Sequence, residues 1–348
     1  MSTSLTVRPY EPVDEPHVLD LLNLTLGQGR AFERSLAFFR WKHLENPFGP
    51  SLMLLANGQE LVGLRAFLRW QFRARDTIVP AVRAVDTATH PRYQRMGVFS
   101  RLTRASLERA AAEGVQFVFN TPNQYSLPGY LKLGWQFVGR TTIMVRPLRP
   151  LRMAAAALTR RPAHTDDGAP AGGTARDGGG DGAGHAVEAL LAHGPGLEAL
   201  LARDDAHAAD GIRTLRSAAY LRWRYATAPS LEYRAAWAGD GTIQAAVIYR
   251  RTRRRGLAEL SIAEVLFGEP RWGRAALRRA LDEAPADYAV AHCAWATPHR
   301  QLLVSLGFMP VPRVGPNFTV RPLGDRPLDC DPASARNWRL SLGDLEVF

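Results

Sequence analysis

The sequence is poor in cysteine and has no long apolar run. Cys293 and Cys330 are the only cysteines among 348 residues, too few for a disulfide framework or a four-cysteine zinc site. The N-terminus lacks the apolar segment of a signal peptide, and no stretch of about 18 apolar residues occurs. We therefore expect a cytoplasmic protein that is not embedded in a membrane and holds no metal.

Lysine is almost absent as well. Only Lys42 and Lys132 are lysines among the 44 basic residues, so 42 are arginines, and the formal net charge is +11 at pH 7. Such a charge is compatible with nucleic-acid binding, which would give a steep salt dependence. The arginines are spread through the chain beside much alanine, which indicates a compositional habit. We expect no nucleic-acid partner and expect the charge to attract an anionic small ligand.

One segment without aromatic or large aliphatic side chains divides the chain. Residues 162–185 read PAHTDDGAPAGGTARDGGGDGAGH, which cannot bury enough apolar surface to offset its ordering entropy. We predict one domain over residues 1–150 and a second over 186–325, joined by a flexible linker over 151–185. The tail, 326–348, alternates apolar and polar side chains near its end, so an edge strand and a solvated end both remain open.

The two halves repeat short motifs in the same order. Residues 34–42, RSLAFFRWK, match residues 216–224, RSAAYLRWR, at five of nine positions. Trp41 and Trp223 are equivalent in this match, and we predict that both pack in the core. Four matches at offsets of 182, 179, 173 and 175 residues indicate two copies of one fold. The other three pairs are Pro50-Ser51-Leu52 with Pro229-Ser230-Leu231, Leu133-Gly134-Trp135 with Leu306-Gly307-Phe308, and Val145-Arg146-Pro147-Leu148 with Val320-Arg321-Pro322-Leu323.

Hydrophobic periodicity predicts the same order of elements in each copy, with antiparallel strands leading into a βαβ unit. The fold class is therefore α/β, a mixed sheet flanked by helices. In the first copy we predict helices over 15–26, 34–43, 99–113 and 125–133, and strands over 51–56, 61–72, 77–88, 115–120 and 136–146. In the second copy we predict strands near 231–238, 243–250, 257–267 and 287–295, and helices over 271–284 and 299–306.

The junction between a strand and a helix at residues 85–104 is the most informative segment. The strand ends at His90-Pro91, and Gly97 opens a long helix. Free backbone N–H groups and the positive end of the helix dipole meet at such a junction and bind anions. The arginines that add cationic character are Arg92, Arg95, Arg101 and Arg104.

These residues resemble the GNAT-superfamily acetyltransferases, whose signature here is [Q/R]-x-x-G-x-[G/A]. The run from Gln94 to Val98 fits it, while Phe99 stands where the family prefers a small residue. A bulky side chain there must point away from the phosphates. A second motif agrees, because Asn123 follows the next strand and residues 130–135, YLKLGW, match the family's Y-x-K-x-G-F.

The resemblance implies a GNAT fold in two tandem copies, with acetyl-CoA as cosubstrate. The pyrophosphate would lie on the amides of the loop, the pantetheine would pair with the strand before it, and a backbone N–H there would stabilise charge on the thioester oxygen. Tyr130 would donate a proton to the departing thiolate. The residues implied to bind the cosubstrate are Thr87, Ala88, Thr89, Gln94, Arg95, Met96, Gly97, Val98, Phe99, Ser100 and Asn123.

A general base is harder to assign. Asp86 is the best candidate, because a charged side chain is conspicuous in the apolar strand AVRAVDTA. The alternative is an ion pair on the sheet with Arg83 or Arg65, and both interpretations remain open.

The second copy lacks both motifs. Its equivalent segment, residues 268–281, reads GEPRWGRAALRRAL, and Leu303 occupies the tyrosine position. We therefore expect a degenerate copy that supports the first, helps to form the acceptor pocket or mediates a homodimer.

Together these features predict an enzyme that moves an acetyl group directly from acetyl-CoA to a primary amine of a small molecule or peptide. The alternative is a catalytically inactive GNAT-fold module that binds CoA or a partner. Neither the acceptor nor the length of the acyl group follows from the sequence.

Overall fold

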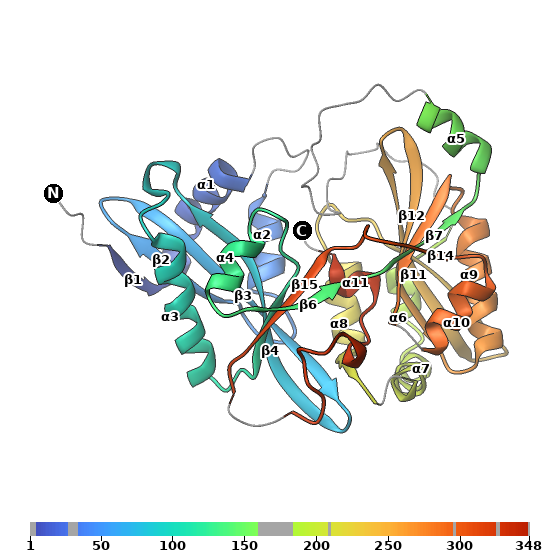
Figure 1. Cartoon of the computed structure of the whole chain (residues 1–348). Coiled ribbons are helices and arrows are strands. Elements are labelled where there is room, and N and C mark those ends of the chain that lie inside the picture. The colour runs from blue at the N-terminus through green and yellow to red at the C-terminus, as the bar shows by residue number, and fades with distance from the viewer. Residues whose placement is uncertain are drawn as a thin grey trace.

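Two α/β units lie side by side, each built around a β-sheet (Figure 1). The computed structural model describes residues 5–26, 34–158, 184–207, 210–294, 297–324 and 328–346. Most of the predicted linker lies outside these residues. The predicted mixed α/β class is confirmed. No helix among the described residues is long and apolar enough to cross a membrane.

The first sheet is antiparallel except for its β4–β5 pair, which is parallel. Its central strands are apolar almost throughout, because helices cover both faces. Two short elements, η1 (Pro12–Asp14) and η2 (Pro91–Tyr93), are single turns beside it. In spatial order the strands are β1 (Thr6–Pro9), β2 (Leu52–Asn57), β3 (Leu61–Ala74), β4 (Thr77–Thr89), β5 (Phe117–Asn120), β15 (Asn317–Pro322) and β6 (Gln136–Arg140), with β9 (Ile212–Thr214) paired to the end of β3.

The helices of the first unit divide between two apolar clusters, one on each face of this sheet. Val18, Leu21 and Leu22 recur at helical spacing and bury one face of α1 (Glu15–Leu26). The Ser35 side chain caps α2 (Leu36–His43), which lies in the same cluster. The other cluster holds α3 (Val98–Ala112) and α4 (Leu127–Lys132).

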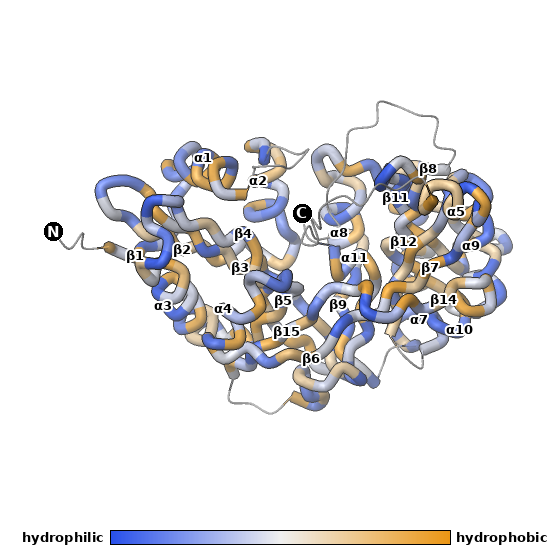
Figure 2. Tube along the Cα trace, turned by 45° about the horizontal axis from the view of Figure 1, so that its top comes forward, coloured by the Kyte–Doolittle hydropathy of each residue, from blue (hydrophilic) through white to orange (hydrophobic). Residues whose placement is uncertain are grey.

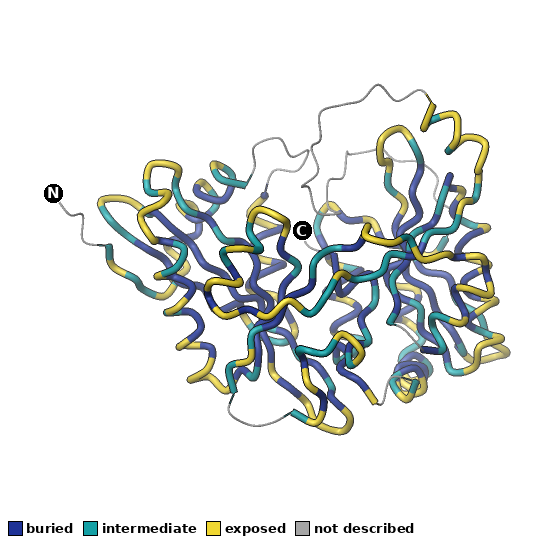
Figure 3. Tube along the Cα trace, in the orientation of Figure 1, coloured by how far each residue is buried: buried dark blue, intermediate teal, exposed yellow. Residues whose placement is uncertain are grey.

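The second sheet repeats this plan around two long antiparallel strands, packed against a helix on one face. Figure 2 shows apolar residues along these central strands, and Figure 3 shows the same strands buried while α5 stays exposed. In spatial order its strands are β14 (Met309–Val311), β7 (Ile143–Pro147), β13 (Tyr288–His292), β12 (Leu257–Phe267), β11 (Ile243–Arg254), β10 (Arg234–Gly239) and β8 (His185–Ala186). The helical segments of this part are α5 (Pro150–Leu158), α6 (Val187–Leu191), α7 (Pro195–Ala206), α8 (Ala218–Leu221), η3 (Arg222–Ala226), α9 (Pro270–Glu283) and α10 (Pro298–Ser305).

Each sheet contains strands from the other half of the chain: β7 lies in the second sheet, and β15 and the short β9 lie in the first. Strand β7 inserts between β13 and β14 of the second sheet, and β15 inserts between β5 and β6 of the first. The single strand expected over residues 136–146 is therefore wrong. The chain leaves the first sheet after β6 and enters the second at β7, with only two residues between the strands.

The two crossing segments run against each other. The backbone N–H of Thr141 donates to the carbonyl of Pro316 at 3.0 Å. A Cβ atom on Gly315 would lie 1.6 Å from the carbonyl oxygen of Thr141, so only glycine permits this approach. The exchange of β7 and β15 between the sheets therefore depends on close backbone packing of Thr141 against residues 315 and 316.

Equivalent tryptophans of the two halves meet where the units join. The indole N–H of Trp41 donates to the carbonyl of Trp223 at 2.7 Å, and that of Trp223 donates to the carbonyl of Trp41 at 2.8 Å. Their rings stack with centroids 5.4 Å apart, and both are buried. The predicted core packing of both residues is confirmed, in a self-complementary contact typical of two-fold symmetry.

The described part of the tail, residues 328–346, forms neither of the two structures left open by the sequence. It contains the short helices η4 (Ala335–Asn337) and α11 (Leu342–Leu345). Between them, Trp338 makes one isolated β-bridge to Ile212. Trp338 is buried against four aromatic rings of the first sheet, including those of Phe72 and Phe318. Residues 338–346 of the tail are mostly buried and contact both units, through Arg83 of the first and Glu264 of the second.

Candidate active site

Strands β4 and β5 diverge in the middle of the first sheet. They pair only where Ala81–Arg83 lies beside Phe117–Phe119, although β4 continues to Thr89. Asp86 forms a bulge in β4 with φ +34°, because β3 residues 65 and 66 pair with Thr87 and Val85 and skip it. Beyond residue 83 the edge of β4 that faces β5 therefore has no strand partner among the described residues. Thr87, Ala88 and Thr89 lie on this edge.

The start of α3 offers unsatisfied backbone donors beside the same strand. Gly97 caps α3 with φ +77° and no side-chain cap, and Arg95 also has a positive φ, +64°. Within the described chain, the amides of residues 95–100 donate no hydrogen bond. The loop residues Gln94, Arg95, Met96 and Gly97 are exposed, Phe99 and Ser100 are half-buried and Val98 is buried.

Val98 fixes the first turn of α3 on the sheet. A Cβ atom on Gly63 of β3 would lie 2.6 Å from Cγ1 of Val98, so glycine at 63 permits this close packing. The loop before α3 is held by His90, whose ring nitrogen Nδ1 accepts from the backbone of Arg92 at 3.3 Å. These contacts hold the N-terminus of α3, with its backbone N–H groups that are unpaired in the described chain, beside β4.

Tyr130 lies on α4 and reaches back to β3. Its hydroxyl oxygen accepts a hydrogen bond from Nη1 of Arg65 at 2.9 Å, and the same Nη1 bonds to the hydroxyl of Thr87. The ring of Phe99 meets the Tyr130 ring edge-on at 5.7 Å. As expected from its bulk, Phe99 turns its side chain toward α4 rather than toward the loop amides.

Asp86 is the centre of a buried ion cluster. Its carboxylate contacts Nη1 of Arg34 at 2.5 Å, Nζ of Lys42 at 2.6 Å and Nε2 of His43 at 2.9 Å. Burial alone would raise the pKa of Asp86, but Arg34 and Lys42 hold it well below its usual range. Burial lowers the pKa of Lys42 to about 8 and also lowers that of His43. The alternative of an ion pair is thus realised, but the expected partners, Arg83 and Arg65, are wrong.

The distance along the chain explains why these partners were missed. Arg34, Lys42 and His43 belong to α2 and its approach, more than 40 residues before Asp86, and nothing in the local sequence pairs them. Arg83 instead donates to the carbonyls of Asp344 and Leu345 in the tail, at 2.6 and 3.0 Å.

Asn123 is used locally. Its side-chain oxygen accepts hydrogen bonds from the backbone of Tyr125 and Ser126, at 3.0 and 2.9 Å. The side chain is exposed and orders the turn before α4. It therefore helps to place Tyr130 from a distance.

Comparison with known proteins identifies the first unit. The model of the acetyltransferase (GNAT) domain family matches residues 6–138. The chain carries a GNAT domain. No curated protein matches the chain.

Solved structures share the fold over nearly the whole chain. A probable N-acyltransferase of unknown function from Enterococcus faecalis is 14% identical, with a TM-score of 0.61, over 92% of this chain and 73% of that one. A GCN5-related N-acetyltransferase from Kribbella flavida is 17% identical, with a TM-score of 0.57, over 92% and 71%. An N-myristoyltransferase from Saccharomyces cerevisiae with bound myristoyl-CoA is 14% identical, with a TM-score of 0.56, over 100% and 86%. The GNAT fold in two tandem copies is thereby confirmed.

The second GNAT copy lacks the anion-binding junction for a structural reason. Only Gly268 and Glu269 separate β12 from α9, whereas eight residues separate β4 from α3. Glu269 places a carboxylate at the start of α9, and Pro270 removes a backbone donor there. Leu303, at the tyrosine position, is buried and offers no proton.

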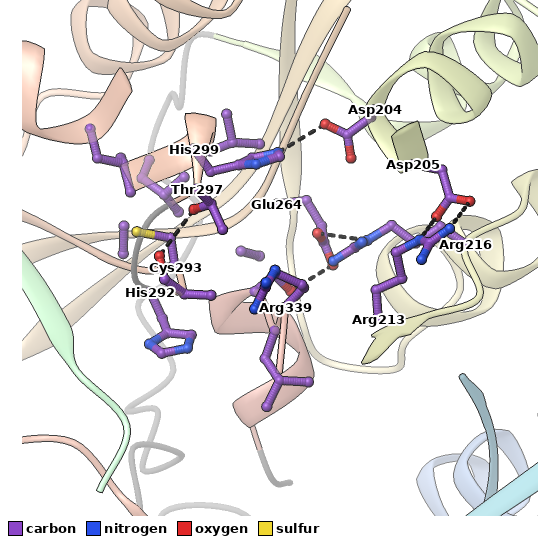
Figure 4. Close-up of a pocket in the computed structure, with 18 residues that line it drawn as sticks. Asp204, Asp205, Arg213, Arg216, Glu264, His292, Cys293, Thr297, His299 and Arg339 are labelled. Atoms are coloured by element: carbon purple, nitrogen blue, oxygen red, sulfur yellow. Dashed lines mark hydrogen bonds and ion pairs between the residues drawn. The ribbon is translucent and has the colours of Figure 1, made fainter. Parts of the chain in front are cut away.

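The strands of the second copy nevertheless diverge like those of the first. β12 and β13 pair only at residues 259–261 with 288–290, and a bulge at Ala263 occupies the place of Asp86. A cleft of about 600 Å³, its open mouth included, follows this divergence (Figure 4). Its labelled lining residues are Asp204, Asp205, Arg213, Arg216, Glu264, His292, Cys293, Thr297, His299 and Arg339.

Glu264 is the residue of this cleft that sequence reasoning missed. It is only 1% exposed and occupies the register position of Thr87. Its carboxylate accepts hydrogen bonds from Tyr225, Ser341 and Arg216 at 2.7, 2.9 and 3.0 Å. Burial raises its pKa to about 7, against the opposing charge of Arg216. The sequence offered one signal for Glu264, namely an acidic residue within the apolar strand LSIAEVLF.

Proposed function

We propose that the protein transfers an acetyl group from acetyl-CoA to a primary amine, and that the reaction occurs in the first GNAT domain. The observation that supports this best is the place of Tyr130. Its hydroxyl reaches the β3–β4 pair through Arg65, which also bonds to Thr87 on the free edge of β4. A proton donor thus lies beside the strand edge that would hold the thioester.

The donor would bind along features that have no other protein partner. The amides of residues 95–100 fit a pyrophosphate, because six consecutive donors at a helix N-terminus have no hydrogen-bond partner in the described chain. The open edge of Thr87–Thr89 fits a pantetheine arm that pairs as an extra strand. The exposed arginine Arg95 adds positive charge at the loop.

The reaction would then proceed by direct attack. The neutral amine nitrogen forms a bond to the thioester carbon, and a backbone N–H of the β4 edge stabilises the charge on the oxygen. The carbon–sulfur bond breaks, its electron pair stays on sulfur, and Tyr130 transfers its hydroxyl proton to that thiolate. The amine loses its proton to a base or to water.

Asp86 does not suit the role of that base. Three nitrogens already occupy its carboxylate, and its lowered pKa makes it a weak proton acceptor. We therefore propose that Asp86 anchors α2 to the bulge of β4 and that water or another group receives the amine proton.

The test begins with calorimetry of the full chain with acetyl-CoA and CoA. Turnover is then followed as CoA thiol release with a panel of amines, a readout that the protein disturbs little because both of its cysteines are buried. Longer acyl-CoA donors in the same assay measure the acyl specificity. Absence of binding to acetyl-CoA and CoA would refute the proposal, and tight binding without turnover would favour the inactive CoA-binding module.

Tyr130→Phe isolates the acid. We expect kcat to fall at least about ten-fold with KM for acetyl-CoA nearly unchanged, because general acids contribute about 10²–10⁴-fold. Tyr125→Phe is the matched control, since Tyr125 precedes the same helix and is 76% exposed. Full activity of Tyr130→Phe would remove Tyr130 from the mechanism.

A further inference from the structure

Arg65 is a buried cation without an anion. Its side chain starts from the middle of β3 and is 0% exposed. No carboxylate of the described residues forms an ion pair with it, and its Nε and Nη2 atoms have no hydrogen-bond partner there. Only Nη1 is engaged, by Tyr130 and Thr87.

Aromatic rings surround this guanidinium in place of an acid. Its Cζ atom lies 4.8 Å from the ring centre of Phe67, 5.3 Å from that of Tyr130 and 5.7 Å from that of Phe99. Cation–π attraction offsets part of the cost of removing the charge from water, but less than a paired carboxylate would. An apolar side chain of similar size would satisfy this position without that cost.

The contacts of Arg65 are those that a proton donor needs. The Tyr130 oxygen accepts a hydrogen bond from Arg65, so its own proton is directed elsewhere and stays available for donation. The bond to Thr87 ties the same guanidinium to the open edge of β4. The uncompensated charge therefore lies between the proposed acid and the strand that would hold the thioester.

We propose that Arg65 is a positioning residue, which orients the Tyr130 hydroxyl so that its proton is directed toward the departing thiolate. The inference rests on the proposed function. In the step concerned, the carbon–sulfur bond breaks, sulfur keeps the electron pair and takes the proton of Tyr130, and the phenolate recovers a proton from water. Arg65 keeps all of its protons and acts on Tyr130 through its hydrogen bond.

A double-mutant cycle tests this role. We expect Arg65→Met to lower kcat at least about ten-fold while KM for acetyl-CoA changes little. In the Tyr130→Phe background the same substitution should cost at most about two-fold, because the residue acts through Tyr130. Arg65→Lys keeps the charge and should restore part of kcat.

Thermal unfolding separates this role from a structural one. Because Arg65 is buried without an acid, Arg65→Met should leave the Tm unchanged or raise it. Arg69→Met is the control on the same strand, since Arg69 is ion-paired with Glu113 and bonded to the carbonyl of Pro50. That control should lower the Tm slightly and leave kcat unchanged.

The outcomes are distinguishable. A fall in Tm together with equal losses of kcat in both backgrounds would make Arg65 structural and overturn the inference. Undiminished kcat in Arg65→Met, with Tyr130→Phe impaired, would overturn it while the proposed function stands. Failure of the wild-type protein to bind or turn over acetyl-CoA would overturn both, and it is visible before any variant is made.

Discussion

Removal of the Asp86 carboxylate separates its two sequence-based interpretations. Asp86→Asn keeps the shape of the side chain and leaves Arg34 and Lys42 buried without their anion. Removing one partner of a buried ion pair costs about 3–5 kcal/mol, because the remaining charge stays desolvated. For a folding unit of 150–250 residues this corresponds to a fall in Tm of about 6–20 °C.

The assay is a thermal unfolding scan of wild type and variant as a function of pH. The folded pKa of Asp86 lies well below its unfolded value, so its stabilisation is present above about pH 4 and is lost as the pH falls through the folded pKa. We therefore expect the difference in Tm between wild type and variant to shrink as the pH falls below about 4.

Glu113→Gln provides the matched control. Its ion pairs with Arg69 and Arg109 involve side chains that are 30% exposed or more, and such pairs contribute at most about 1 kcal/mol. If Asp86→Asn unfolds like the wild type but loses its turnover, the structural interpretation of Asp86 is refuted and the base role returns.

Three further perturbations test the second unit, the strand exchange and the loop. Glu264 has a raised pKa, so its contribution to the stability of the fold is complete below about pH 4.5 and is lost as the pH rises through about 7. Glu264→Gln should therefore flatten the pH dependence of Tm over this window. An unchanged pH profile would contradict this prediction. Gly97→Ala should cost about 1 kcal/mol, because alanine is strained at the positive φ of Gly97, and no more than that, because its Cβ would meet nothing within 4 Å. The same variant should weaken acetyl-CoA binding in calorimetry. Gly315→Ala should lower the Tm far more than Gly97→Ala, because its Cβ collides with the carbonyl of Thr141, and equal melting of the two variants would show that the crossing segments are not tightly packed.

The sequence predicted the individual elements of each copy well. The expected strands over 61–72, 77–88 and 257–267 correspond to β3, β4 and β12, with ends that differ by at most two residues. Long runs of apolar residues carry this information, and such a run is visible from residues that are neighbours in the sequence. The loop before α3 was equally accessible, because Gly97 and the residues around it are contiguous.

Contacts between distant segments were not accessible in this way. The partners of Asp86, the bond from Arg65 to Tyr130 and the burial of Glu264 each join residues more than 30 positions apart. The tail illustrates the limit, since its alternating pattern is compatible with a strand, yet α11 fills the junction of the two units.

The repeated motifs by themselves determined that the chain holds two copies of one fold, and only the first copy carries the GNAT loop motif. Their last pair, residues 145–148 and 320–323, falls on β7 and β15. Both strands end in Val-Arg-Pro, and this shared ending does not indicate which sheet each one joins. Only the tertiary structure decided that they are exchanged, since the short β6–β7 connection and the crossing at Gly315 direct each strand into the opposite unit. The same packing brought Arg65 to Tyr130 and made an isolated cation part of the proposed site.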